Sequence, residues 1–161
     1  AERHGRRRSE SQRLIDKARR GCSYFISQGI YDAAPTIAML HDYARDCAEQ
    51  GAAPRRIVLD FVPVGRPQTM EFIRWLGISI PDATAAAILG DQAPLSRSIA
   101  VCCELLRRVL DQPYAEQIPL GIAVESVSIN KEEIGASIEL VEALREVAAE
   151  RGLPVPQATT S

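Results

Sequence analysis

The sequence is poor in aromatic residues and cysteines and has no long apolar run. Only 5% of its 161 residues are aromatic, and its four cysteines are Cys22, Cys47, Cys102 and Cys103. They form no CxxC pair and fall within apolar strand or helix patterns, so we expect reduced core thiols rather than a disulfide framework or a zinc site. No stretch approaches the roughly 18 uninterrupted apolar residues of a membrane span, and no charged-then-apolar leader opens the chain. The default expectation is a cytoplasmic protein that has no membrane partner.

Glycine-rich phosphate-binding turns are also missing. Neither GxGxxG nor GxxxxGK[ST] occurs, which removes the main support for a Rossmann or P-loop fold. The first twenty residues carry eight Lys or Arg against three acidic residues, although the whole chain has a net charge of -2. No aromatic residue interrupts this basic segment, so we expect no nucleic-acid partner. A phosphate-bearing cofactor and a merely solvated helix face remain as its two interpretations.

Helix and strand patterns alternate along the chain. Apolar periodicity predicts helices over residues 9–20, 35–50, 68–76, 81–89, 94–110 and 131–151, and strands over residues 22–28, 56–62 and 120–127. In the last helix, the predicted buried face carries Ile134, Ile138, Val141, Leu144 and Val147 or Ala148. The alternation predicts the α/β class with parallel strands joined by crossovers. Three strands are few for a parallel sheet covered on both faces, so the sequence reads as part of a larger fold.

The most informative segment is the predicted strand that ends at Gln28. Tyr24-Phe25-Ile26 is bulky and β-prone, yet the strand finishes on a polar amide, with Asp32 just beyond it. In α/β folds, ligands bind at the carboxyl ends of parallel strands. Gln28 is therefore either a ligand contact or simply the exposed end of a strand.

Several segments in a fixed order carry a family resemblance. They are Ala1-Glu2-Arg3-His4, the step of 17 residues to Gly21, Tyr24-Phe25-Ile26-Ser27-Gln28 with Tyr31-Asp32, Val62-Pro63-Val64, Trp75-Leu76-Gly77-Ile78 before Ile80-Pro81, and the last strand before Asn130-Lys131. Together they resemble the C-terminal half of methylenetetrahydrofolate reductase. The resemblance covers almost the whole chain, although none of the segments is diagnostic alone.

This resemblance implies a parallel (β/α)8 TIM-type barrel. Residues 1–152 would be the C-terminal part of one barrel domain, and residues 153–161 a tail. The family binds FAD and reduces 5,10-methylenetetrahydrofolate to 5-methyltetrahydrofolate, with hydride from NAD(P)H passing through the flavin. The implied partners are a folate substrate and either a second copy of the chain or the missing half of the barrel.

The resemblance also assigns residues to the site. Those implied to bind the cofactor are His4, Glu10, Arg13 and Lys17, and those implied to bind the substrate are Gln28, Gln68 (or Thr69, if the loop has no gap) and Lys131. An amide offers both donors and acceptors to a pterin edge, and a cation suits the glutamate carboxylates of a folate. No catalytic residue and no metal ligand is implied.

The chain departs from the family pattern at two strands. Leu59-Asp60 stands where the family has Pro-Gly, and Glu125-Ser126-Val127-Ser128 replaces a more aromatic pattern. The acidic proton donor and the flavin-side aspartate of the family's earlier strands have no counterpart here. We therefore expect the isolated chain to be inactive, because catalysis needs positioned groups from both halves. The alternative is a non-catalytic, barrel-derived binding or assembly module.

Overall fold

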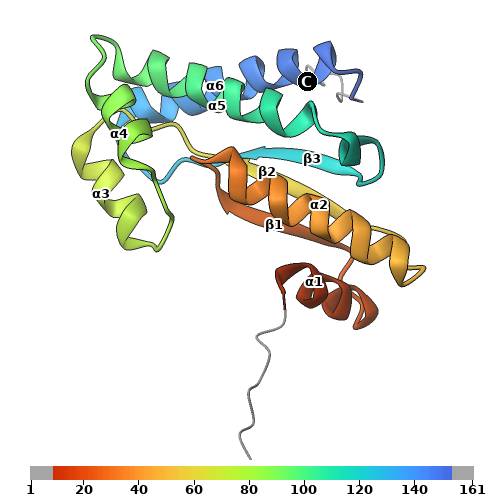
Figure 1. Ribbon diagram of the computed structural model, residues 1–161. Helices are drawn as coiled ribbons and strands as arrows, with labels where there is room; N and C mark the ends of the chain where they lie inside the picture. The colour runs from red at the N-terminus through yellow and green to blue at the C-terminus, as the bar shows by residue number, and fades with distance from the viewer. Residues whose placement is uncertain (1–8, 154–161) are drawn as a thin grey trace, which may run out of the picture.

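The computed structural model describes residues 9–153, which form an α/β fold (Figure 1). The elements in chain order are α1 (Glu10–Arg19), β1 (Tyr24–Gly29), α2 (Ala33–Glu49), β2 (Arg56–Phe61), α3 (Pro67–Trp75), α4 (Asp82–Leu89), α5 (Pro94–Leu110), the 3-10 helix η1 (Pro113–Glu116), β3 (Leu120–Val124) and α6 (Lys131–Glu150). All the predicted helices and strands are present, with ends shifted by a few residues at most. None of these helices is both long and apolar enough to cross a bilayer.

The three strands form one parallel sheet in the order β1-β2-β3. The parallel α/β class is therefore confirmed, but the expectation of a (β/α)8 barrel is wrong for this chain. A barrel closes only when its first and last strands pair. Here β1 and β3 each pair only with β2, so the sheet formed by the described residues is open.

Helices cover one face of this sheet. In β2, Ile57, Leu59 and Phe61 are buried, and Figure 1 shows α2 in front of the sheet with α5 and α6 above it. On the other face, which we call the open face, Tyr24 and Ile26 of β1 remain 58% and 56% exposed. Side chains alternate between the faces along a strand. The open face therefore carries alternate residues of each strand.

Local sequence explains where the helices begin. The Asp32 side chain accepts a hydrogen bond from the Ala34 backbone N–H and so caps α2. Pro67 and Pro94 stand in the first turns of α3 and α5, where a missing N–H costs nothing. Gly77 has a φ of 85°, a conformation that few side chains tolerate, and it follows the end of α3.

Two core predictions are wrong. Ile134, Ile138 and Val141 are 41%, 67% and 39% exposed, because α6 turns the neighbouring stripe inward. The buried residues of α6 are Glu133, Ala136, Leu140, Leu144, Val147 and Ala148. Cys22 is exposed because it lies in the turn between α1 and β1 rather than inside a strand, whereas the other three cysteines are buried.

The pairing of β1 with β2 is irregular near the carboxyl end. Ile26 pairs with Val58 but Gly29 pairs with Asp60, so β1 uses one more residue than β2 over this interval. The Ser27 hydroxyl fills the gap by accepting the Asp60 backbone N–H at 3.0 Å. A side chain thus takes the place of a backbone acceptor at the end of the sheet.

Candidate functional site

The carboxyl end of β1 is tightly packed beneath an exposed Gln28. The Tyr31 hydroxyl donates to the Val62 carbonyl oxygen at 2.8 Å, and burial raises the pKa of Tyr31 far above its usual range. A Cβ on Gly29 would lie 3.2 Å from the Val62 side chain. Gln28 is the penultimate residue of β1 and its side chain is exposed. Its position is as predicted, and its role as a ligand contact remains a prediction.

Gln68 lies on an exposed face of α3 that also carries two aromatic rings. Gln68, Phe72 and Trp75 are spaced four and three residues apart, which places them on one side of a helix. Phe72 is 42% and Trp75 is 77% exposed. Their rings stack with centroids 5.8 Å apart and an interplanar angle of 18°. We call these three residues the aromatic face of α3.

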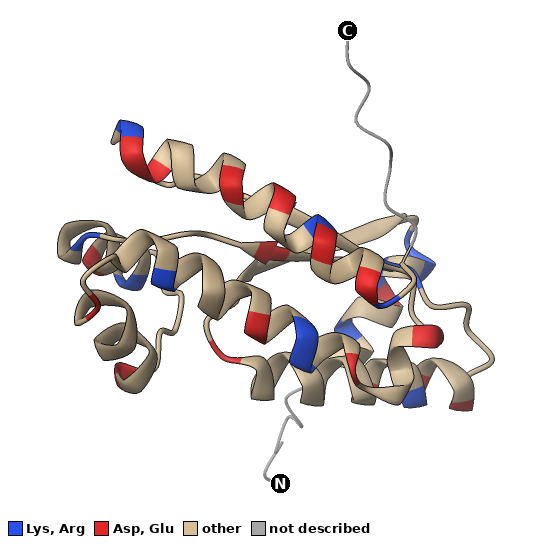
Figure 2. Cartoon of the chain, turned by 90° about the horizontal axis from the view of Figure 1, so that it is seen from above, with Lys and Arg blue, Asp and Glu red and all other residues tan. Residues whose placement is uncertain are grey.

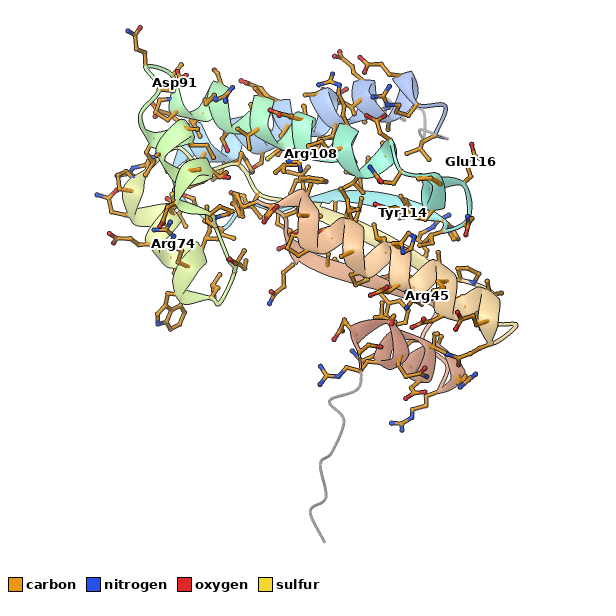
Figure 3. All side chains as sticks on the ribbon, viewed as in Figure 1. Arg45, Arg74, Asp91, Arg108, Tyr114 and Glu116 are labelled. Carbon is orange, nitrogen blue, oxygen red and sulfur yellow. The ribbon has the colours of Figure 1, made fainter. Side chains whose placement is uncertain are left out.

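Helix α3, which carries the aromatic face, lies at the carboxyl end of the sheet. Figure 1 shows α3 and α4 at the end of the sheet. The loop after α3 reaches the strand, since a Cβ on Gly29 would be 3.8 Å from the Ile78 side chain. Arg74, labelled in Figure 3, fixes this loop by donating to the Ile80 carbonyl at 3.2 Å and pairing with Asp82 at 3.0 Å.

A buried carboxylate connects the starts of α3 and α6. Glu133 is 1% exposed and accepts hydrogen bonds from the Gly65 backbone N–H at 3.1 Å and the Thr69 hydroxyl at 2.8 Å. Because Thr69 is engaged in this contact, the exposed Gln68 is the better ligand candidate of the two. Lys131 is the first residue of α6 and is exposed, so it lies at the same end of the molecule.

Of the residues implied to bind FAD, Glu10, Arg13 and Lys17 are not gathered with Gln28. Glu10 and Arg13 form an ion pair with each other at 3.3 Å, and Lys17 is exposed in the last turn of α1. Helix α1 packs against the last turns of α2, where the Ser11 hydroxyl donates to Asp46 at 2.6 Å. Those turns lie away from the α2 start that follows β1 (Figure 1). His4 lies outside the described residues.

Asp60 is a polar residue of the site that the family resemblance did not assign. It belongs to β2 and is 3% exposed, and its Oδ1 atom has no hydrogen-bond partner within the part of the chain that the structure describes. Burial, followed by the nearby charge of Glu125, raises its pKa from 3.8 to about 7. The sequence did contain a sign of it, since Asp60 interrupts the apolar run from Ile57 to Val62.

One hollow lies at the carboxyl end of the sheet and another lies along its β3 side. One of about 210 Å³ lies between the starts of α5 and α6 and is lined in part by Gly65, Leu95 and Glu133. A larger one of about 350 Å³ is lined by residues of β3 and α6 together with Arg56 and Val58.

Within residues 9–153 no group of three or more His, Cys, Asp or Glu side chains could hold a metal ion. Figure 2 shows acidic and basic residues interspersed along the helices.

Comparison with known proteins finds similarity to a solved structure. The chain is similar to a solved structure described as an uncharacterized protein from Clostridium thermocellum that binds two copies of 5-methyl-5,6,7,8-tetrahydrofolic acid. The TM-score is 0.76 and the sequence identity 32%, and the match covers 86% of this chain. It covers 48% of the other chain, so this chain spans about half the length of that protein. No protein-family model and no curated protein matches the sequence.

Proposed function

We propose that this chain is part of a protein that binds a reduced folate at the carboxyl end of the sheet. The observation that carries the proposal is the aromatic face of α3, which presents an amide and two stacked rings to solvent on a helix at the carboxyl end of the sheet. Phe72 and Trp75 are exposed and adjacent, and contiguous exposed apolar surface is typical of sites that bind a ligand or a partner. The C. thermocellum protein, which shares the fold and binds 5-methyltetrahydrofolate, supports the same ligand class.

The chemistry of a reduced folate fits this end of the molecule. Its pterin ring is flat and carries hydrogen-bond donors and acceptors along one edge. Phe72 and Trp75 supply surfaces for stacking, while the amides of Gln28 and Gln68 offer both donors and acceptors. Lys131, at the start of α6, supplies a cation for the glutamate carboxylates at the other end of the ligand.

A finer proposal concerns catalysis by the protein that contains this chain. The resemblance to methylenetetrahydrofolate reductase supports reduction of 5,10-methylenetetrahydrofolate with NAD(P)H and FAD in one-carbon metabolism. On this proposal Lys17→Ala weakens FAD binding by roughly 1.5 to 3 kcal/mol, the range for hydrogen bonds to charged groups. Flavin titration of the flavin-containing protein measures it, and unchanged affinity would make Lys17 only a solvated helix residue.

A non-catalytic binding module is the second candidate. It is favoured by the position of Glu10, Arg13 and Lys17 on α1, which packs against the last turns of α2 and not beside Gln28. The absence of flavin from the purified protein, together with intact folate binding, would favour this candidate over the reductase.

Trp75 provides a direct test of folate binding. It is the only tryptophan in the sequence, so its fluorescence reports on the aromatic face alone. Titrating the 161-residue chain with 5-methyltetrahydrofolate should quench this fluorescence with saturation. Gln28→Ala should weaken binding by about tenfold, equivalent to about 1.4 kcal/mol, while leaving thermal stability unchanged.

Gln117→Ala is the matched control, because Gln117 is also an exposed glutamine but precedes the amino end of β3. It should bind like the wild type. Equal losses in the two variants would show that Gln28 has no specific part in binding. The absence of any saturable quenching, with calorimetry also showing no binding, would contradict the folate proposal itself.

A further inference from the structure

Both backbone groups of Asp60 are hydrogen-bonded, whereas one of its carboxyl oxygens is not. Its N–H donates to the Ser27 hydroxyl at 3.0 Å, and its carbonyl accepts the Ile30 N–H at 3.0 Å. The Oδ1 atom, by contrast, is buried without a partner in residues 9–153. Leaving a buried polar atom unpaired costs free energy, and native proteins retain few such atoms. The Oδ1 atom of this carboxyl therefore lacks a partner among the described residues, although the Phe61 backbone N–H donates to the carboxyl group.

The sheet geometry places this carboxyl on the open face. In β2, Ile57, Leu59 and Phe61 are buried against the helices, so Asp60 alternates to the other side. Asp60 pairs with Ala123 of β3, and the exposed Glu125 follows two residues later. On the β1 side stands the exposed Gln28. Asp60 itself is 3% exposed and is flanked in the sheet by Gly29 of β1 and Ala123 of β3. Gln28 of β1 and Glu125, just after β3, are therefore exposed polar residues near it.

The surroundings of Asp60 disfavour its charged form. Burial and then the carboxylate of Glu125, which follows β3, raise the pKa of Asp60, and these effects outweigh a hydrogen bond from the Phe61 backbone N–H, which lowers it. The charge of Asp60 in turn contributes to the raised pKa values of two buried groups. These are Tyr31, in the loop after β1, and Cys102, in α5. No cation among the described residues forms an ion pair with it. A hydrogen-bond donor from a ligand would thus fill an otherwise unmet requirement.

We propose that Asp60 is a ligand-binding residue whose carboxylate accepts hydrogen bonds from a ring edge that carries adjacent N–H and NH2 donors. This inference rests on the proposed folate site, because the 2-amino-4-oxo-pyrimidine edge of a reduced folate has such a pair of donors. Two parallel donors match the two oxygens of a carboxylate, and hydrogen bonds to an ionised acceptor are the stronger kind. The amide of Gln28 can meet the neighbouring ring oxygen.

The proposal predicts that binding is linked to a proton. Asp60 has a pKa of about 7 in the free protein and must ionise to accept both hydrogen bonds. Binding therefore releases a proton and becomes tighter as the pH rises. Between about pH 6 and about pH 8 the affinity should increase about tenfold, following the ionised fraction of a group with its pKa between these values.

Calorimetric titration of the 161-residue chain with 5-methyltetrahydrofolate tests this at about pH 6 and about pH 8. Asp60→Asn keeps the shape of the side chain but offers only one acceptor oxygen. It should bind at least about tenfold more weakly at the higher pH and lose most of the pH dependence. Wild type in two buffers of different ionisation enthalpy should reveal the released proton.

Glu125→Gln is the second variant, and it changes an exposed residue, so its fold is not at risk. Removing this negative charge lowers the pKa of Asp60, so binding at about pH 6 should become tighter than in the wild type. If Asp60→Asn and Glu125→Gln both keep the wild-type affinity and pH profile while Gln28→Ala weakens binding, the Asp60 inference is wrong and the folate site stands. If the wild type does not bind, both proposals fail.

Discussion

At the scale of single residues, Glu133 is the side chain on which the carboxyl end of the sheet most depends. It accepts hydrogen bonds from two donors that lie 64 and 68 residues earlier in the chain. Glu133→Ala would leave the Gly65 N–H and the Thr69 hydroxyl without partners. We expect a loss of roughly 2 to 6 kcal/mol in the free energy of unfolding, since each of the two donors left unsatisfied costs about 1 to 3 kcal/mol.

Urea unfolding measures this loss, and Glu132→Ala is its matched control. Glu132 stands in the same first turn of α6 but is exposed. Its removal should cost no more than about 1 kcal/mol, the usual value of a charge near a helix start. Equal effects of the two substitutions would mean that the buried contact contributes little.

Asp60 should make stability depend on pH in a direction that is unusual for a carboxyl group. Its pKa is 3.8 ordinarily and about 7 in the folded chain, so the folded state holds a proton that the unfolded state releases. Stability from this group is therefore greatest at acidic pH and falls as the pH rises from about 4 to about 7. Asp60→Asn should remove this fall and raise the melting temperature above neutral pH.

The comparison with the wild type isolates the effect of Asp60. Asp46 contributes with the opposite sign, because the Ser11 hydroxyl and then Arg45 lower its pKa. Thermal unfolding of both proteins over the same pH series should give curves that diverge as the pH rises. Parallel curves would show that Asp60 is not protonated in the folded chain.

At the scale of the secondary-structure elements, the start of α6 depends on its cap. The Asn130 side chain accepts hydrogen bonds from the backbone N–H groups of Glu132 at 3.0 Å and Glu133 at 3.3 Å. Asn130→Ala should lower the free energy of unfolding by about 1 kcal/mol, and Asn130→Asp should restore it because Asp caps helices equally well. Denaturant unfolding of the two variants measures these changes. An equal loss of unfolding free energy in Asn130→Ala and Asn130→Asp would contradict the capping role.

The elements themselves were largely predictable from the sequence, and α5 has the predicted bounds Pro94–Leu110. The buried side of α6 was not. Ile134, Ile138 and Val141 form one apolar stripe and Leu140, Leu144 and Val147 form another beside it. Periodicity identifies the helix, but only the packing against α5 and β3 selects the stripe that turns inward.

The candidate site was predictable in part for a similar reason. The end of a strand can be read from local pattern, so Gln28 was found. The aromatic face of α3 was readable too, from the spacing of Gln68, Phe72 and Trp75. The unpaired Oδ1 atom of Asp60 could not be predicted, because whether it has a hydrogen-bond partner depends on residues that lie far away in the sequence.

At the scale of the whole molecule, the prediction that failed is closure of the sheet into a barrel, since the three predicted strands are all present. Each βα unit has local patterns, but whether a sheet closes depends on pairing between strands that are distant in the sequence. In residues 9–153 that pairing ends at β1 and β3, and the open face remains exposed.

This open sheet should make the 161-residue chain associate in solution. Two strand edges have free backbone groups, and Tyr24 and Ile26 expose apolar surface next to one of them. Ile26→Lys should shift sedimentation toward the monomer, because a charge on the open face opposes its burial. Ile129→Lys, at a fully exposed isoleucine in the loop before α6, should not. A wild type that is monomeric at all concentrations would contradict this prediction.

The Ser27 hydroxyl also determines how the end of the sheet moves. It rotates about a single bond, whereas a backbone carbonyl is fixed by the strand that carries it. Opening this contact costs about one hydrogen bond, on the order of 1 kcal/mol, and leaves the pairing of Phe25 with Ile57 intact. The amide hydrogen of Asp60 should therefore exchange with solvent through a small local opening, well before the amides deeper in β2. Asp60, the residue proposed to bind the ligand, therefore lies in the part of β2 that opens most readily.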